Sequence, residues 1–177
     1  MMFEILGYEP QYRGHAFDVA KVQVRLPDGR VRFYDLVEHR DSISIVPVDA
    51  QGRILFVAQY RIGAGQELLE LPAGVMEDGE EARACAEREI REETGYAARE
   101  WIELGQFYLA PGYCTERMMA FLARDLYAAP LHPDVDEFLR LRVLSIEEAY
   151  AMAQRGEIRD SKTLAALFLA RPYLLPR

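Results

Sequence analysis

The stretch from residue 74 to residue 96, GVMEDGEEARACAEREIREETGY, constrains the fold more than any other part of the chain. Gly and Pro residues interrupt residues 72–80, which predicts a loop there. Residues 81–94 contain neither, and they are dominated by Ala, Arg and Glu, which favour helices. Gly95 is suited to end a helix in the left-handed conformation. The sequence therefore predicts a loop, a helix of about four turns and a sharp stop.

Three carboxylates lie near the end of this expected helix. Glu89, Glu92 and Glu93 are spaced i, i+3 and i+4, so they share one face. Their mutual repulsion calls for a positive partner, and a hard divalent cation such as Mg²⁺ takes oxygen ligands of this kind. Cys85 and Ala86 lie earlier on roughly the same face, which favours an inward orientation. The alternative is a solvated charged helix, the commoner meaning of a Glu/Arg-rich pattern.

The full pattern is Gly, five residues, Glu, seven residues, then Arg-Glu-apolar-any-Glu-Glu-any-Gly. It resembles the signature of the Nudix hydrolases. One position departs, because Tyr96 stands where the family pattern prefers an aliphatic residue. The resemblance implies an α/β fold, the Nudix α/β/α sandwich with a mixed central sheet. It also implies hydrolysis of a nucleoside diphosphate that is linked to another moiety.

The resemblance also implies a role for each part of the pattern. The metal would be Mg²⁺, with Mn²⁺ able to substitute for it. Its ligands would be the Ala73 carbonyl and the side chains of Glu89, Glu92 and Glu93, of which Glu92 and Glu93 also count as catalytic. Structural positions in the motif would be Gly74, Glu80, Arg88 and Gly95.

Composition narrows the class of function. The chain has 177 residues, half of them hydrophobic, which is enough for one globular domain with a core. Its net charge of −8 argues against general nucleic-acid binding. The sequence shows no signal peptide and no apolar run near the ~20 residues of a membrane span. Two cysteines form no zinc or redox motif. We therefore expect a cytoplasmic protein without nucleic-acid or membrane partners.

The N-terminal region has the polarity of an antiparallel β-hairpin. Residues 17–26 and 31–38 alternate on either side of a Pro-Asp-Gly-Arg turn. A hairpin alone buries too little surface to be stable. In the Nudix enzymes that this chain resembles, such a piece joins the dimer interface, so the resemblance implies a homodimer. We divide the chain into an N-terminal β segment, residues 1–40, and a Nudix hydrolase domain, residues 41–177.

The remaining elements are expected from alternation, turn residues and caps. Residues 42–48 and 53–60 are predicted to form a second hairpin that feeds the central sheet. A capping box of Ser145 and Glu148 predicts a helix to about residue 155. Further strands are expected at 99–108, 117–124 and 138–144, a loop at 62–67, and a last helix over 162–170 that ends at Pro172.

Three segments outside the signature resemble the ADP-ribose pyrophosphatase-like branch of the family. One of them, residues 156–163 (GEIRDSKT), is interpreted as structural. Residues 59–61, Gln-Tyr-Arg, end in Arg61, whose guanidinium suits phosphate oxygens; a surface charge is the alternative. Residues 110–116, APGYCTE, resemble a Ser-Pro-Gly…Glu element with Ala110 replacing Ser; an ordinary turn is the alternative. Glu70 is either a site carboxylate or a pairing group in a short strand. The expected substrate-binding residues are Arg61, Glu70, Pro111, Gly112 and Glu116.

An acidic loop over residues 127–137 is the expected source of the general base. In the resembling enzymes a loop here closes over the site, and a carboxylate before the next strand orients or deprotonates the attacking water. Glu137 matches that position, and Asp136 and Asp134 are the reserves. A solvated acidic loop is the alternative.

The resemblance favours cleavage of ADP-ribose to AMP and ribose 5-phosphate. The branch often has Arg-Glu where this chain has Tyr34 and Asp35, so GDP-mannose or another nucleotide sugar is the nearest alternative. Hydrolysis of oxidised nucleoside triphosphates fits less well, because of Pro111-Gly112 and the N-terminal hairpin. A non-catalytic Nudix nucleotide-binding module is the alternative of another class. Such modules usually lose a catalytic glutamate, and this chain keeps them all.

Overall fold

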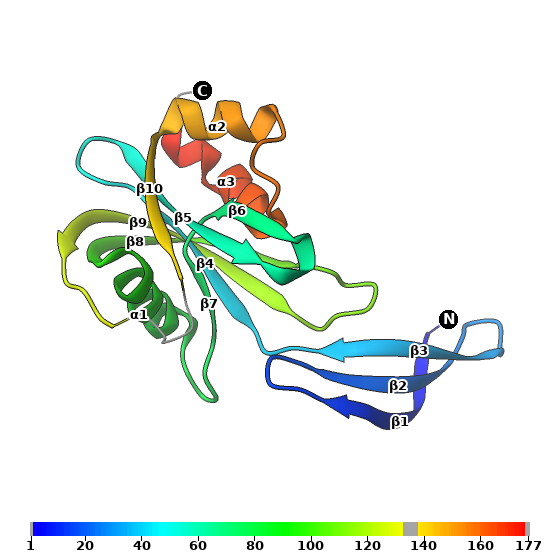
Figure 1. Ribbon diagram of the computed structural model, residues 1–177. Helices are drawn as coiled ribbons and strands as arrows, with labels where there is room; N and C mark the ends of the chain where they lie inside the picture. Colours follow the sequence, from blue (N-terminus) through cyan, green and yellow to red (C-terminus); the bar gives the residue numbers. More distant parts are fainter. Residues whose placement is uncertain (1, 133–137, 176–177) are drawn as a thin grey trace. The chain divides into compact units, whose positions relative to one another are not determined.

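The computed structural model describes residues 2–132 and 138–175. The chain forms two compact units, each with sheets of its own (Figure 1). The smaller unit consists of Met1–Asp41 and Tyr108–Arg117, and the larger consists of Ser42–Phe107 and Met118–Arg177. In the part of the chain that is described, no helix is long and apolar enough to cross a membrane.

The smaller unit contains a three-stranded antiparallel sheet of β1 (Glu4–Arg13), β2 (Asp18–Arg25) and β3 (Val31–Glu38), in that order. The pairing of β2 with β3 confirms the predicted hairpin. Strand β1 extends it, and its pairing with β2 shifts register near Gly7 and Pro10. Those two residues weaken the strand signal, which explains why the sequence did not predict β1.

The larger unit is built around a four-stranded mixed sheet. Strand β4 (Ser42–Pro47) runs parallel to β9 (Arg117–Ala128) and antiparallel to β7 (Ala73–Val75). With β8 (Tyr96–Tyr108) at the other edge, the order is β7-β4-β9-β8. The mixed sheet confirms the predicted fold class. The loop predicted over residues 72–80 is wrong in part, because Ala73–Val75 pair with the start of β4.

Strand β4 is buried on both faces, since its side chains alternate between two layers. Ile43 and Ile45 pack in one cluster with Cys85, Ala86 and Ile90 of helix α1 (Ala82–Thr94). Val46 of the strand, and Val48 just after it, belong to a second cluster with residues of helix α3 (Ser161–Leu174). The sheet is therefore covered on both faces, as the predicted sandwich requires.

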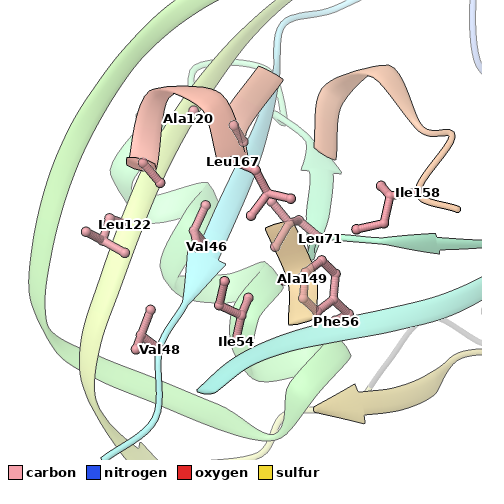
Figure 2. Packing of buried hydrophobic residues seen from close by; sticks show 12 residues of the cluster. Val46, Val48, Ile54, Phe56, Leu71, Ala120, Leu122, Ala149, Ile158 and Leu167 are labelled. Atoms are coloured by element: carbon pink, nitrogen blue, oxygen red, sulfur yellow. The ribbon is translucent and has the colours of Figure 1, made fainter. Parts of the chain in front are cut away.

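A second sheet, antiparallel, has the order β10-β5-β6 and lies against the second cluster. Figure 2 shows this core, with Phe56 and Ile54 from the sheet facing Val46, Leu71 and Leu167. Its strands are β10 (Arg140–Ser145), β5 (Arg53–Arg61) and β6 (Gln66–Glu70), with a 3₁₀ turn, η1 (Ile62–Ala64), before β6. Part of the loop predicted over residues 62–67 is thus the start of β6.

The predicted hairpin of residues 42–48 and 53–60 is wrong. The turn between them forms, with the Gly52 amide donating to the Asp49 carbonyl at 3.0 Å. The strands then separate into the two sheets, and their described residues form a single isolated bridge, Val48 to Ile54. The parallel pairing of β4 with β9, distant in sequence, replaces the local pairing.

Helices α2 and α3 each begin directly after an N-cap residue. Helix α2 (Ile146–Gln154) begins at Ser145, whose Oγ accepts from the Glu148 amide at 3.1 Å, as predicted. Helix α3 does not end at Pro172 as expected but runs to Leu174. Pro172 lies in the last turn, where its missing amide removes one backbone hydrogen bond.

Candidate active site

Helix α1 presents its carboxylates as the spacing predicts. The helix ends at Gly95, which adopts the left-handed conformation with φ 79°. Cys85, Ala86 and Glu89 are buried on one face, and Glu89 is only 7% exposed. A carboxylate at this depth distinguishes the helix from an ordinary solvated one.

Gly74 receives the Glu89 side chain. A Cβ added at Gly74 would lie 1.9 Å from Glu89 Oε1 and 2.0 Å from its carboxyl carbon. Pairing with Ile43 of β4 fixes the backbone of Gly74, so the glycine cannot simply move aside. The absence of a side chain here is therefore what allows the carboxylate to lie over strand β7.

Glu93 reaches the residue just before this glycine. Its Oε2 accepts a hydrogen bond from the Ala73 amide at 3.3 Å. The last turn of α1 and strand β7 thus bring Glu89 and Glu93 to two adjacent backbone positions, Ala73 and Gly74. These are the residues that the sequence predicts as metal ligands and as their structural support.

Arg88 holds the acidic cluster together. Its Nη1 donates to Glu89 Oε1 at 2.6 Å and to Glu92 Oε2 at 3.0 Å. Its Nε and Nη2 donate to the two oxygens of Glu80, both at 3.1 Å, and Glu80 also accepts from the Glu77 amide. The hydrogen bonds from Arg88 hold the pKa of Glu80 below its usual value. The guanidinium therefore joins the loop before α1 to the carboxylates of the helix.

The donor set suits a divalent cation. Carboxylate and carbonyl oxygens are the ligands that Mg²⁺ and Mn²⁺ prefer, and Gly74 leaves the space that Glu89 occupies. Among the described residues, no three acidic, histidine or cysteine side chains already surround a common cation position. Arg88 supplies the positive charge for Glu89 and Glu92 instead. The ligand set of Ala73, Glu89, Glu92 and Glu93 stays a prediction.

Arg61 lies at the end of β5 in a partly buried ion-pair network. Its Nε and Nη2 donate to the two oxygens of Glu70 at 2.8 and 2.6 Å. Hydrogen bonds with Glu70 raise the pKa of Arg61, and the charges of Asp160 and Glu93 act in the same direction. Arg61 is therefore within electrostatic reach of Glu93, one carboxylate of α1.

Glu70 is 1% exposed and contacts a second cation, Lys162. Burial opposes the ionisation of Glu70, but Arg61 and Lys162 outweigh it, and its pKa lies below its ordinary value. Thr163 accepts a hydrogen bond from the Leu71 amide at 2.9 Å, which ties α3 to the segment before β7. Sequence reasoning recognised the run from Asp160 to Thr163 as typical of the branch but did not connect it with Glu70.

The other predicted substrate-binding residues belong to the smaller unit. Pro111 and Gly112 lie in a turn in which the Tyr113 and Cys114 amides donate to the Ala110 carbonyl. Glu116 lies 3.7 Å from the His39 ring. Their roles in substrate binding stay predictions, and so does that of Glu137, which lies outside the described residues together with Asp134 and Asp136.

Comparison with known proteins agrees with this geometry. Residues 38–167 match the family described as NUDIX domain. The chain is 32% identical over 164 residues to ADP-ribose pyrophosphatase of Bacillus subtilis (strain 168), covering 92% of this chain and 89% of that protein. It is 35% identical over 170 residues to ADP-ribose pyrophosphatase of Mycobacterium tuberculosis (strain ATCC 25618 / H37Rv), with 93% and 81% covered. A solved structure, "Crystal structure of ADP compounds hydrolase", has a TM-score of 0.89 at 26% identity and covers 98% of this chain and 95% of its own.

The family match covers most of the chain, and the fold carries helix α1 with its glutamates as expected. This chain therefore belongs to the Nudix hydrolase family. This confirms the resemblance drawn from the signature. Within the family, the chain falls in the ADP-ribose pyrophosphatase-like branch.

Proposed function

We propose that this protein hydrolyses the diphosphate bond of ADP-ribose and releases AMP and ribose 5-phosphate. The reaction class rests on one observation, the convergence of Glu89 and Glu93 on the backbone of Ala73 and Gly74. The similarity to ADP-ribose pyrophosphatases supports the choice of substrate. One water is consumed, and its oxygen forms the new P–O bond as the bridging P–O bond breaks.

Nudix hydrolases generally use a divalent metal, and we propose Mg²⁺, with Mn²⁺ as a substitute. Its ligands would be the carboxylates of Glu89, Glu92 and Glu93 and the carbonyl of Ala73. When bound, the cation neutralises phosphate charge and lowers the pKa of a bound water. The face of α1 supports this assignment, because it directs hard oxygen donors toward one short segment of backbone.

The chain's own side chains would bind and orient the substrate. Arg61 donates Nε and Nη2 to Glu70, and its Nη1 has no hydrogen-bond partner in the part of the chain that is described. Because the side chain is 41% exposed, we assign this remaining donor to a phosphate oxygen. The substrate-binding roles of Pro111, Gly112 and Glu116 and the base role of Glu137 are further parts of the proposal.

We expect purified protein with Mg²⁺ to convert ADP-ribose to equal amounts of AMP and ribose 5-phosphate. Chromatography of the products measures this directly, beside parallel reactions with GDP-mannose and a nucleoside triphosphate. A larger kcat/KM for GDP-mannose would keep the reaction and change the substrate. No turnover of any of the three, with Mg²⁺ or Mn²⁺, would contradict the proposal and favour a nucleotide-binding module.

We further propose that residues 1–40 form the interface of a homodimer. Large apolar side chains on β1 and β3 support this: Ile5 is 71% exposed and Phe33 is 58% exposed. We expect sedimentation velocity to show a dimer and Phe33→Glu to weaken it at least about tenfold. Phe168→Glu, a matched change at a 75% exposed site in α3, should leave the dimer intact. A wild-type monomer would contradict this assignment.

A further inference from the structure

Glu70 is shared between two cations. It is 1% exposed, and Arg61 engages both of its oxygens, while Lys162 Nζ also contacts Oε2. A buried carboxylate needs about one unit of positive charge nearby to remain ionised. Here it contacts two cations, and the second of them, Lys162, is also paired with the carboxylate of Asp160.

Lys162 is itself held in place. It is 9% exposed, and its Nζ lies 3.0 Å from Asp160 Oδ1. The other oxygen of Asp160 accepts from the Thr163 amide at 2.9 Å and caps helix α3. The lysine is therefore fixed at the start of a long helix, and its ammonium has a defined position beside Glu70.

We propose that Lys162, held by Asp160, is a positioning residue for Arg61. By contacting Glu70 it orients the carboxylate that holds Arg61. Arg61 then keeps a fixed orientation in which its remaining donor can bind a diphosphate oxygen. This inference rests on the proposed function, since it assigns Arg61 to the phosphates of a nucleoside diphosphate sugar.

The geometry supports an action through Arg61 and not a purely structural one. Lys162 and Arg61 come from α3 and β5, and both contact Oε2 of the same carboxylate. The charges of Asp160 and Glu93 also act on Arg61, so the network lies within electrostatic reach of one carboxylate of α1. Removing the lysine would leave Glu70 held by Arg61 alone, so the carboxylate that orients the guanidinium would be less well fixed.

A double-mutant cycle tests the proposal. Lys162→Met, Arg61→Met and the double variant are compared with the wild type for the kcat and KM of ADP-ribose hydrolysis. Calorimetry gives the Kd of an ADP-ribose analogue with a methylene bridge between its phosphorus atoms, with Mg²⁺ present. We expect Lys162→Met to raise KM and Kd about tenfold, the loss of roughly one charge-assisted contact, and to change kcat less than about threefold. In the Arg61→Met background the same change should raise Kd less than about twofold.

Equal effects of Lys162→Met in both backgrounds would overturn the proposal, because the lysine would then act independently of Arg61. No effect in the wild-type background would overturn it as well. Asp160→Asn keeps a good helix cap but removes the charge that holds Lys162, so it should raise Kd in the same direction by a smaller factor. Arg155→Met, which removes one positive charge from a surface ion pair on α2, is the matched control and should leave Kd unchanged.

The two readouts separate this inference from the proposed function. If the wild type binds the analogue but does not hydrolyse ADP-ribose, the proposed function fails and the Kd cycle still decides the role of Lys162. If the wild type hydrolyses ADP-ribose but the cycle is additive, the function stands and the positioning role fails. Thermal unfolding of every variant ensures that each Kd refers to folded protein.

Discussion

Glu93→Gln should lower kcat for ADP-ribose hydrolysis on the order of 10³-fold, since loss of the proposed metal ligand would remove several kcal/mol of transition-state stabilisation. The glutamine keeps an oxygen that can accept from the Ala73 amide, so the hydrogen bond seen at 3.3 Å can survive. We therefore expect little change in thermal unfolding. The measurement is the rate of AMP formation at saturating ADP-ribose and Mg²⁺.

Glu87→Gln is the matched control for this change. Glu87 lies on the same helix, but it is exposed and pairs with Arg83 at 2.9 Å, away from the acidic cluster. Exposed pairs of this kind contribute little to stability. The control should keep kcat within about twofold of the wild-type value. If Glu93→Gln retains more than about a tenth of wild-type kcat, Glu93 does not have the role given to it here.

Gly74→Ala should lower activity on the order of 10²-fold by displacing Glu89, because small misplacements of catalytic groups have effects of this size. The added Cβ would lie 1.9 Å from Glu89 Oε1 and 2.6 Å from Glu89 Cγ. Gly74 is not among the residues with positive φ, so alanine fits its backbone conformation. The lost space is therefore the main consequence. Activity measured across a Mg²⁺ titration should show a higher half-saturating concentration.

Gly63→Ala provides the comparison, because an added Cβ would meet no described atom within 4 Å beyond the adjoining backbone and its chain neighbours, and φ is also not positive. It should leave both kcat and the Mg²⁺ dependence unchanged. Equal activity of Gly74→Ala and wild type would show that Glu89 can leave β7 without consequence. That result would remove the main structural reason for a glycine at this position.

Local features of the fold were predictable from the sequence. Helix α1 follows from helix-forming residues that end at Gly95, and α2 follows from the Ser145 cap. The sheet topology was not predictable in the same way. A turn at residues 49–52 indicates that the chain reverses, but it carries no information on whether the flanking strands pair with each other. Burial on both faces draws β4 to β9, far along the chain.

The candidate site likewise has a part that was predictable from the sequence and a part that was not. Spacing within one helix predicts that Glu89, Glu92 and Glu93 share a face, because helix geometry sets their separation. The contact of Lys162 with Glu70 joins residues 92 positions apart, and no periodicity reports it. The sequence places Gly74 in the signature but does not show why a glycine is needed there. The structure shows the reason, because the Glu89 side chain occupies the space that a Cβ at Gly74 would fill.

Arg88 has a consequence for how the protein is made. Because this guanidinium already lies among Glu80, Glu89 and Glu92, the acidic cluster has a counter-ion that is part of the chain itself. We therefore expect a newly synthesised chain to complete its fold without a divalent cation.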